Sequence, residues 1–172
     1  MMETKLVLEK IEEKDRELFK NLYQLYIHDI TLFLPMGMDE DCLFKFEYEN
    51  GYFGEKSKIN GRFSFFIKDK NKTGNQIIGF VLVNKEFMVL KNEKNDYNMA
   101  EMFVINEYKC KGVGKSIANM IFDMFKGKWE VKPVPRSDKA KAFWERTINE
   151  RTGGNYKTEF PKPNRTTFIF ES

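Results

Sequence analysis

Cysteine, histidine and proline are scarce in this sequence. Its 172 residues include two cysteines, Cys42 and Cys110, one histidine and five prolines. Cysteines this far apart form no disulfide framework and show none of the close spacings of a metal site. We therefore expect a protein without a metal, in a reducing compartment such as the cytoplasm. The N-terminal stretch is charged throughout and has no apolar segment of a secretory signal, which agrees with that expectation.

Long hydrophobic runs and a strong excess of one charge are also missing. The longest apolar stretch is IIGFVLV at residues 77–83, far short of the ~20 residues that a membrane-spanning helix needs. The formal net charge is only +3, whereas nucleic-acid-binding domains usually carry a marked basic excess. We therefore expect neither a membrane nor a nucleic acid as a partner.

The composition that is present is typical of one globular domain. Hydrophobic residues make up 41% of the chain, charged residues 32%, and aromatic residues, 17 of them Phe, 15%. Such a chain can fill a core and is not expected to be disordered. No repeat, low-complexity tract or linker divides the sequence, so residues 1–172 are expected to form a single domain.

Several segments have the alternation or the β-branched and aromatic content of strands. They are residues 5–10, 62–68, 76–84, 97–105, 128–132, 155–160 and 166–171. Apolar residues at helical spacing predict helices between them. Together these segments predict a mixed α/β fold around one sheet.

The first helix is expected to begin after an N-cap at Asp15 and to run to about Ile30. Its predicted core-facing residues are Leu18, Leu22, Leu25 and Tyr26. Residues 39–50 are expected to hold a short helix capped by Asp39 or Asp41, and Gly74 is expected in a turn between two strands.

Two further helices are predicted in the second half of the chain. The first should end at Gly127, and its core-facing residues should be Ile117, Met120, Ile121, Met124 and Phe125. The second should begin at an N-cap, Ser137, and end at Gly153 and Gly154. Its predicted core-facing residues are Ala140, Phe143, Trp144, Thr147 and Ile148.

The stretch YKCKGVGKS, at residues 108–116, is the clearest motif. A triphosphate-binding P-loop would need glycine where Lys109 stands, and a dinucleotide-binding fingerprint would need glycine where Ile117 stands. Both motifs are therefore incomplete. A glycine turn that opens into a helix N-terminus still favours a phosphate, because the first N–H groups of a helix have no carbonyl partner. The alternative is a tight strand-to-helix turn surrounded by solvated lysines.

Two stretches, in order, resemble the GNAT superfamily of N-acetyltransferases. AEMFVINEYKCKGVGKSIA contains Lys109-x-x-Gly112-x-Gly114, and the acetyl-CoA signature of that family has Arg or Gln, then Gly, then Gly or Ala at the same spacing. WEVKPVPRSDKAKAFWERTI is similar to the family's fifth strand, which carries a Glu, and to the helix after it. The resemblance covers residues 98–148, about a third of the chain.

The sequence departs from the family pattern at several positions. Lys109 replaces the usual Arg or Gln, which keeps a charge but loses the planar fork of Arg. Ser137 stands where Asn is common, and Trp144 stands where a Tyr often acts as general acid. An indole is not an acid, so Tyr108 and Tyr156 are considered as substitutes.

The resemblance implies a mixed, mostly antiparallel sheet of about six or seven strands. Helices would cover both faces, and a parallel strand pair would splay apart to admit acetyl-CoA. The strand end at residues 103–105 would pair with the pantetheine, and the backbone of residues 111–116 would hold the diphosphate. The implied cofactor-binding residues are Phe103, Val104, Ile105, Lys109, Cys110, Lys111, Gly112, Val113, Gly114, Lys115, Ser116, Ser137, Phe143 and Trp144.

Acetyl transfer requires a neutral amine, and a lysine-type amine has a pKa near 10.4, so a base must remove a proton. Glu130 and Glu101 are the candidate bases, because each is a charged residue in an otherwise apolar strand. Glu130 is favoured by the resemblance, since some GNAT enzymes that acetylate protein N-termini carry Glu at the matching place. Others carry it on the strand of Glu101. The alternative for each residue is an ion pair with a nearby lysine.

We therefore expect an acetyl-CoA-dependent N-acetyltransferase that acts on a small-molecule or peptide amine without a metal. The alternative is a GNAT-like module that binds CoA or a partner without turnover. A homodimer is also considered, in which the aromatic segment 166–170 pairs across the interface. Aromatic residues that could line the acceptor groove, or equally fill the core, are Tyr26, Tyr48, Tyr52 and Phe53.

Overall fold

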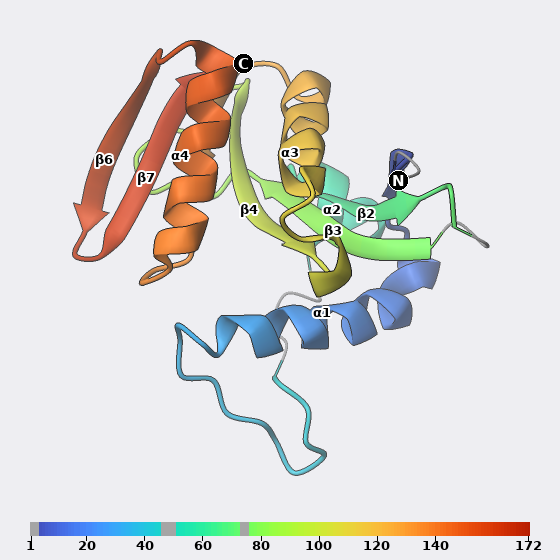
Figure 1. Ribbon diagram of the computed structural model, residues 1–172. Coiled ribbons are helices and arrows are strands. Elements are labelled where there is room, and N and C mark those ends of the chain that lie inside the picture. Colours follow the sequence, from blue (N-terminus) through green and yellow to red (C-terminus); the bar gives the residue numbers. More distant parts are fainter. Residues whose placement is uncertain (1–3, 46–50, 73–75) are drawn as a thin grey trace.

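A computed structural model describes residues 4–45, 51–72 and 76–172. One seven-stranded sheet has the order β1-β2-β3-β4-β5-β7-β6, and helices cover both of its faces (Figure 1). The strands are β1 (Leu6–Lys10), β2 (Phe63–Asp69), β3 (Gln76–Asn84), β4 (Asp96–Val104), β5 (Lys128–Val131), β6 (Tyr156–Lys162) and β7 (Arg165–Glu171). The helices are α1 (Arg16–Ile30), α2 (Gly54–Ile59), α3 (Val113–Met124) and α4 (Asp138–Thr152).

The predicted mixed fold with one mostly antiparallel sheet is confirmed. Among the described residues all neighbouring strands are antiparallel except β4 and β5, which run parallel. The strand predicted to pair across a homodimer is β7, and it lies between β5 and β6. Residues 168–170 are hydrogen-bonded to a strand on each side, so this part of the segment has no edge left for a partner, and the homodimer itself stays a prediction.

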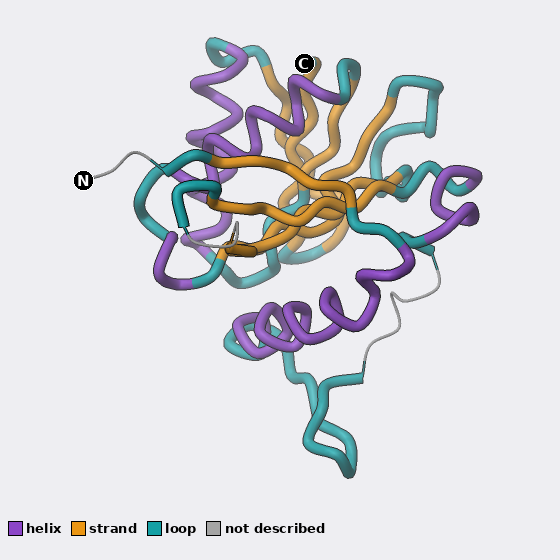
Figure 2. The backbone as a smooth tube through the Cα atoms, turned by 90° about the vertical axis from the view of Figure 1, so that its right-hand side faces the viewer, coloured by secondary structure: helices purple, strands orange, loops and turns teal. Residues whose placement is uncertain are grey.

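The sheet separates two clusters of buried apolar side chains. The α3–α4 cluster includes Ile117, Ile121 and Trp129. The α1 cluster includes Phe19, Phe80 and Phe103. Figure 2 shows the strands between α1 on one side and α3 and α4 on the other. The predicted placement of helices on both faces is therefore confirmed.

The predicted inward face of α1 is wrong for two of its leucines. Leu18 is 49% exposed and Leu25 is 54% exposed. The helix instead buries a set of mostly aromatic residues: Phe19, Tyr23, Tyr26 and Ile27. Three of their rings pack around Phe80 on β3, with centroid distances of 5.0 to 5.6 Å. Aromatic rings bury a large area each and gain from these tilted and edge-on contacts, so they take the core positions.

The first N-cap prediction is confirmed in position, because Asp15 is the residue directly before the first turn of α1. Asp15 makes no side-chain cap to α1. Its carboxylate accepts a hydrogen bond from the Glu12 N–H (3.1 Å) and so caps the short 3-10 turn Glu13–Asp15 that precedes α1.

The segment after α1 contains a turn where a short helix was predicted. Within residues 39–45, Asp39 accepts hydrogen bonds from the N–H groups of Asp41 (3.1 Å) and Leu43 (2.9 Å). This pattern closes a side-chain turn and does not start a helix. Tyr48 and Gly74, which were also assigned from the sequence, lie outside the described residues.

The ends of α4 agree with the prediction, whereas the buried face and the end of α3 differ from theirs. The Ser137 hydroxyl accepts the N–H of Ala140 (3.2 Å), and Gly153 ends α4 in the left-handed region at φ 61°. The face of α3 is rotated from the prediction, because its buried residues are Val113, Ile117, Ala118, Ile121 and Phe122. The helix ends at Met124 with Phe125 as C-cap, before the predicted Gly127.

Candidate active site

The parallel strands β4 and β5 separate part-way along the sheet. Their pairing runs from Asp96 with Lys128 to Met99 with Val131. Beyond that point β4 continues to Val104, while the chain leaves β5 through a segment with two prolines. The predicted splayed strand pair is therefore confirmed, and it leaves one edge of the second half of β4 without a strand partner.

The backbone at this opening can accept an extended ligand. The Ile105 N–H donates to the Ile78 carbonyl on β3 (2.8 Å). Alternate residues of an antiparallel strand bond to the same neighbour, so the polar backbone groups of Met102 and Val104 face the opening. An extended chain can add to such an edge as a further strand. Of residues 103–105, only Val104 has this orientation, and Met102 was not anticipated.

The turn before α3 has the backbone geometry of an anion cradle. Cys110 and Gly112 both adopt the left-handed region, at φ 60° and φ 81°. The Ser116 N–H makes an early helical hydrogen bond, to the Gly112 carbonyl (3.0 Å). By helix geometry the three amides between them have no carbonyl one turn earlier, and they lie at the positive end of the helix dipole. Backbone N–H groups of this kind bind phosphate.

The lysines around this turn are not equivalent. Lys109 forms an ion pair with Asp29 (2.5 Å). Lys115 forms one with Glu150. Lys111 has no carboxylate partner among the described residues. It is therefore the lysine of the motif whose charge is available to a bound anion.

Gly114 packs closely against a ring of α4. A Cβ at this position would lie 3.3 Å from two ring atoms of Phe143. A Cβ at Gly112 would meet nothing within 4 Å, so the left-handed φ is what favours glycine there. Trp144 is 7% exposed and packs beside Phe143, with 5.0 Å between ring centroids. The predicted burial of Trp144 on α4 is confirmed.

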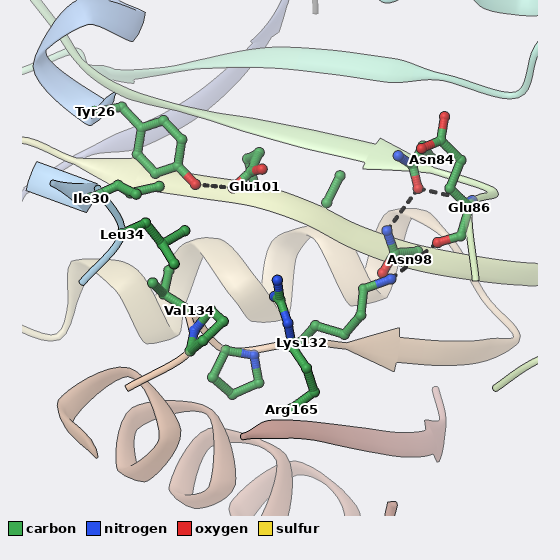
Figure 3. A pocket seen from close by; sticks show the side chains of 13 residues that line it. Tyr26, Ile30, Leu34, Asn84, Glu86, Asn98, Glu101, Lys132, Val134 and Arg165 are labelled. Atoms are coloured by element: carbon green, nitrogen blue, oxygen red, sulfur yellow. Dashed lines mark hydrogen bonds between the residues drawn. The ribbon is translucent and has the colours of Figure 1, made fainter. Parts of the chain in front are cut away.

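A pocket of about 220 Å³ lies where β4 and β5 separate. Figure 3 shows α1 on one wall, β4 on another, and the β5 exit and the start of β7 opposite. The residues that matter for its chemistry are Tyr26, Asn98, Glu101, Lys132 and Arg165. The predicted groove residue Tyr26 therefore lines a pocket, whereas Tyr52 and Phe53 are buried in the α1 cluster.

A β-bulge directs two polar side chains of β4 into this pocket. Leu82 pairs with Glu101 and Val83 pairs with Met99, which leaves Ala100 as an extra residue. An extra residue reverses the alternation of side chains beyond it. Asn98 and Glu101, three positions apart, therefore line the same pocket.

Glu101 has an environment that favours its protonated form at neutral pH. The Tyr26 hydroxyl donates a hydrogen bond to its carboxylate. Burial raises the pKa of Glu101 from its ordinary 4.5 to about 8, against the opposing effect of the Lys132 charge. A carboxyl group with such a pKa in a pocket is a functional candidate on physical grounds.

Glu130 has a different environment. Its carboxylate is fully buried and accepts hydrogen bonds from the N–H groups of Met88 (2.7 Å), Val89 (2.9 Å) and Leu90 (3.1 Å) and from Lys132 (3.0 Å). Burial alone would raise the pKa of this carboxyl, but the backbone and Lys132 hydrogen bonds bring it below its ordinary value. These contacts favour a structural role, in which Glu130 ties the β3–β4 connection to β5.

The tyrosines considered as acids lie away from the pocket. The Tyr108 hydroxyl donates to Asp69 (3.0 Å), and burial together with that hydrogen bond raises the pKa of Tyr108 to about 12. Tyr156 packs against Phe168 in the α3–α4 cluster. Tyr26 is the tyrosine whose hydroxyl meets a pocket carboxylate.

Two asparagines complete the polar wall and were missed from the sequence. The Asn98 side-chain N–H₂ donates to the Asn84 side-chain oxygen (2.7 Å), and Asn84 donates to the Tyr52 hydroxyl (2.9 Å). The side-chain oxygen of Asn98 is buried and has no hydrogen-bond partner. A sequence signal did exist, because both are polar residues within apolar strands.

Residues 4–45, 51–72 and 76–172 contain neither a metal-binding group nor a membrane-spanning helix. No group of three or more His, Cys, Asp or Glu side chains in them is arranged to hold a metal ion. No helix formed by them is long and apolar enough to span a membrane.

Comparisons with known proteins give structural neighbours only. No family model and no curated protein matches the sequence. An acetyltransferase from Thermus thermophilus superposes with a TM-score of 0.65 at 14% identity, covering 97% of both chains. The Vibrio cholerae spermidine N-acetyltransferase, in complex with CoA and spermine, gives 0.58 at 15% identity, covering 96% of this chain and 95% of that one. Arabidopsis thaliana NAA60, in complex with acetyl-CoA, gives 0.60 at 13% identity, covering 98% and 100%.

These three superpositions cover 96–98% of this chain. A related structure from Staphylococcus aureus is itself described as an acetyltransferase of the GNAT family. At this level of identity the likeness concerns the arrangement of the chain in space. This chain has the GNAT acetyltransferase fold.

Proposed function

We propose that this chain is an acetyl-CoA-dependent N-acetyltransferase that acts on a small primary amine, with Glu101 as general base. The observation that carries the proposal is a carboxyl group with a pKa of about 8 in a pocket at the strand split. Neighbours of the same fold in complex with CoA and with acetyl-CoA support the choice of co-substrate.

The residues at the split and at the turn fit acetyl-CoA. Met102 and Val104 offer an unpaired strand edge to an extended chain such as pantetheine. The amides that follow Gly112, together with Lys111, offer positive charge to a diphosphate. When bound, acetyl-CoA supplies the acetyl group as an activated thioester.

The raised pKa of Glu101 lowers the free-energy cost of taking a proton from the ammonium. An ammonium with a pKa near 10.4 gives its proton to an ordinary carboxylate at a cost of about 8 kcal/mol. The same transfer to Glu101, with a pKa of about 8, costs about 3 kcal/mol. The Tyr26 hydrogen bond holds the carboxylate in the pocket while it acts. Tyr26 is therefore assigned a positioning role.

The atoms balance without a separate acid. Glu101 first takes one proton from the ammonium and releases it to water. The neutral amine nitrogen then forms a bond to the acetyl carbon, the carbon–sulfur bond breaks, and a second nitrogen proton goes to Glu101. A thiol has a pKa near 8.5, close to the value of about 8 for Glu101. Protonated Glu101 is therefore acidic enough to pass the proton on to the departing sulfur. This accounts for a site in which Trp144 replaces a tyrosine.

The test measures free CoA release by purified protein with acetyl-CoA and a panel of primary amines. Amine-dependent release, with acetylated amine identified by mass spectrometry, is the expected result. Calorimetry compares acetyl-CoA, CoA and ATP in parallel. Tight binding of CoA without turnover of any amine would indicate a binding module, and tighter binding of ATP would indicate a nucleotide site.

A further inference from the structure

Of the acidic and basic side chains that line the pocket, Glu101 accepts a hydrogen bond from the Tyr26 hydroxyl, and two others form ion pairs. Lys132 forms an ion pair with Glu130 (3.0 Å). Glu86 forms one with Arg62. Arg165 also lines the pocket, but no carboxylate pairs with it among the described residues. Among the described residues, Arg165 is therefore the basic side chain of the pocket that has no ion-pair partner.

Arg165 is held where it can bind a ligand. It begins β7, where it pairs with Lys162 across the turn from β6. Its side chain is partly buried and points into the pocket (Figure 3). A guanidinium is always charged, and its planar fork matches the oxygens of a carboxylate or phosphate. An anion on the ligand would supply the partner that Arg165 lacks.

Asn98 provides a second group in the pocket that lacks a partner and could bind a ligand. It is 2% exposed, and its side-chain oxygen has no hydrogen-bond partner. A buried acceptor without a donor is costly, and such groups normally find a partner. Glu101 lies on the same wall of the pocket. An amine that donates one N–H to Asn98 would lie in the same pocket as the proposed base.

The size of the pocket favours a small ligand. Its volume of about 220 Å³ is below the roughly 300–1,000 Å³ of sites for drug-sized ligands. A linear polyamine would also bring a second ammonium toward Arg165, and like charges disfavour that partner.

We infer that the acceptor is a small amine that also carries an anionic group, with the anion bound by Arg165 and the amine N–H bound by Asn98. The inference rests on the proposed acetyl transfer and narrows its substrate class. An amino acid with a free carboxylate has this chemistry, and so does an amino phosphate.

The experiment compares amines that differ only in the anion. Glycine, β-alanine and γ-aminobutyrate are tested against their neutral amides, and γ-aminobutyrate also against putrescine. Phosphoethanolamine against ethanolamine tests a phosphate in place of a carboxylate. Binding is measured by calorimetry in the presence of CoA, and turnover by CoA release. We expect at least one anionic member to be favoured over its neutral match by about 10- to 100-fold.

Variants assign the preference to Arg165. Arg165→Gln should reduce it to less than about threefold, because one charge-assisted hydrogen-bonded pair is lost. Arg165→Lys should retain part of it, since the charge remains but the fork does not. Lys162→Gln is the matched control, because Lys162 is an exposed cation on the same hairpin that does not line the pocket. It should keep the wild-type preference.

The outcomes distinguish a failure of the inferred substrate class from a failure of the proposed acetyl transfer. Equal binding of anionic and neutral amines, preferred binding of putrescine, or a preference that survives Arg165→Gln would overturn the inference and leave acetyl transfer standing. Preferred binding of an anionic amine that depends on Arg165, without turnover, would support the inference and refute the proposed acetyl transfer.

Discussion

Replacing Glu101 with Gln tests the proposed mechanism most directly. The change keeps the size of the side chain and its ability to accept a hydrogen bond from Tyr26, but it removes the proton acceptor. With an acetylated amine identified, turnover should fall by about 10²–10⁴, the usual contribution of a positioned general base. The affinity for acetyl-CoA should barely change, because the turn at Gly112 and the edge of β4 at Val104 are untouched.

The pH dependence follows from the raised pKa. Only the carboxylate form of Glu101 accepts a proton, so the wild-type rate should rise with pH and level off above its pKa of about 8. The Gln variant should lack that step and should keep rising toward alkaline pH as the amine deprotonates unaided. Rates measured from about pH 6 to about pH 10 would separate the two profiles.

Stability gives an independent measure of the same group. In the unfolded chain Glu101 loses its proton near pH 4.5, whereas in the folded chain it loses it near pH 8. Between those values the folded state binds more protons, so its stability falls as pH rises. The full difference is about 5 kcal/mol as an upper bound, reduced by water that enters the pocket. Gln has no such loss, so the variant should gain stability relative to wild type above about pH 8 and not below about pH 5.

Glu130→Gln is the matched control for this experiment. It removes a second buried carboxylate from the neighbouring strand while leaving Glu101 in place. The reasoning is refuted if Glu101→Gln retains near-normal turnover while Glu130→Gln loses it with its fold intact, since the base would then be Glu130. If both variants remain active at neutral pH, neither carboxylate is the base.

Three further outcomes are expected. Glu130→Gln should lower the free energy of unfolding by about 3–5 kcal/mol in urea titrations at neutral pH, because it breaks a buried, charge-assisted network. That difference should narrow as pH falls below about 4.5, since a lowered pKa adds stability only while the group is ionised, and a loss independent of pH would contradict it. Trp144→Ala should cost about 3–5 kcal/mol by the same assay, and a much smaller value would show that its ring is not packed in the core. Gly114→Ala should lower the melting temperature through contact with the Phe143 ring, and Phe143→Leu should relieve part of that loss; an unchanged melting temperature would refute the packing argument.

Much of the fold could be predicted because its signals are local. Ser137 and Gly153 have the residue types that begin and end helices, and the structure uses both in that way. Most strands are marked by alternation or by a high content of β-branched and aromatic residues. The turn at Gly112 could be found because a left-handed residue before a helix strongly favours glycine.

The spacing of apolar residues alone does not decide which face of α1 is buried. Leucines at 18, 22 and 25 and aromatic residues at 19, 23 and 26 both form stripes at helical spacing. The choice between them depends on Phe80, a residue of β3 far along the chain, around which the aromatic rings close. A helix that offers two possible faces is decided by the surface it meets.

The preference for Glu130 over Glu101 as the base also depended on a part of the chain that is distant in the sequence. Alternation correctly turned Glu130 away from Trp129, which belongs to the α3–α4 cluster. It gave no indication that the N–H groups of residues 88–90 would fill the space in front of the carboxylate. A buried carboxylate that is already bound by donors on both oxygens has little capacity left for a substrate proton.

The bulge at Ala100 is the other feature that the alternation of residues along β4 could not predict. The face of a strand residue is found by counting in twos, and one extra residue inverts the count. By that count Asn98 and Glu101 belong to opposite faces, yet both line the pocket. The bulge sits where β4 is about to lose β5 as a partner, so the same short stretch of strand has an unpaired edge and turns the proposed base into the pocket. A mixed sheet with this local irregularity can therefore place an acceptor amine, a proton acceptor and an unpaired backbone edge together, which a regular strand of the same composition would not do.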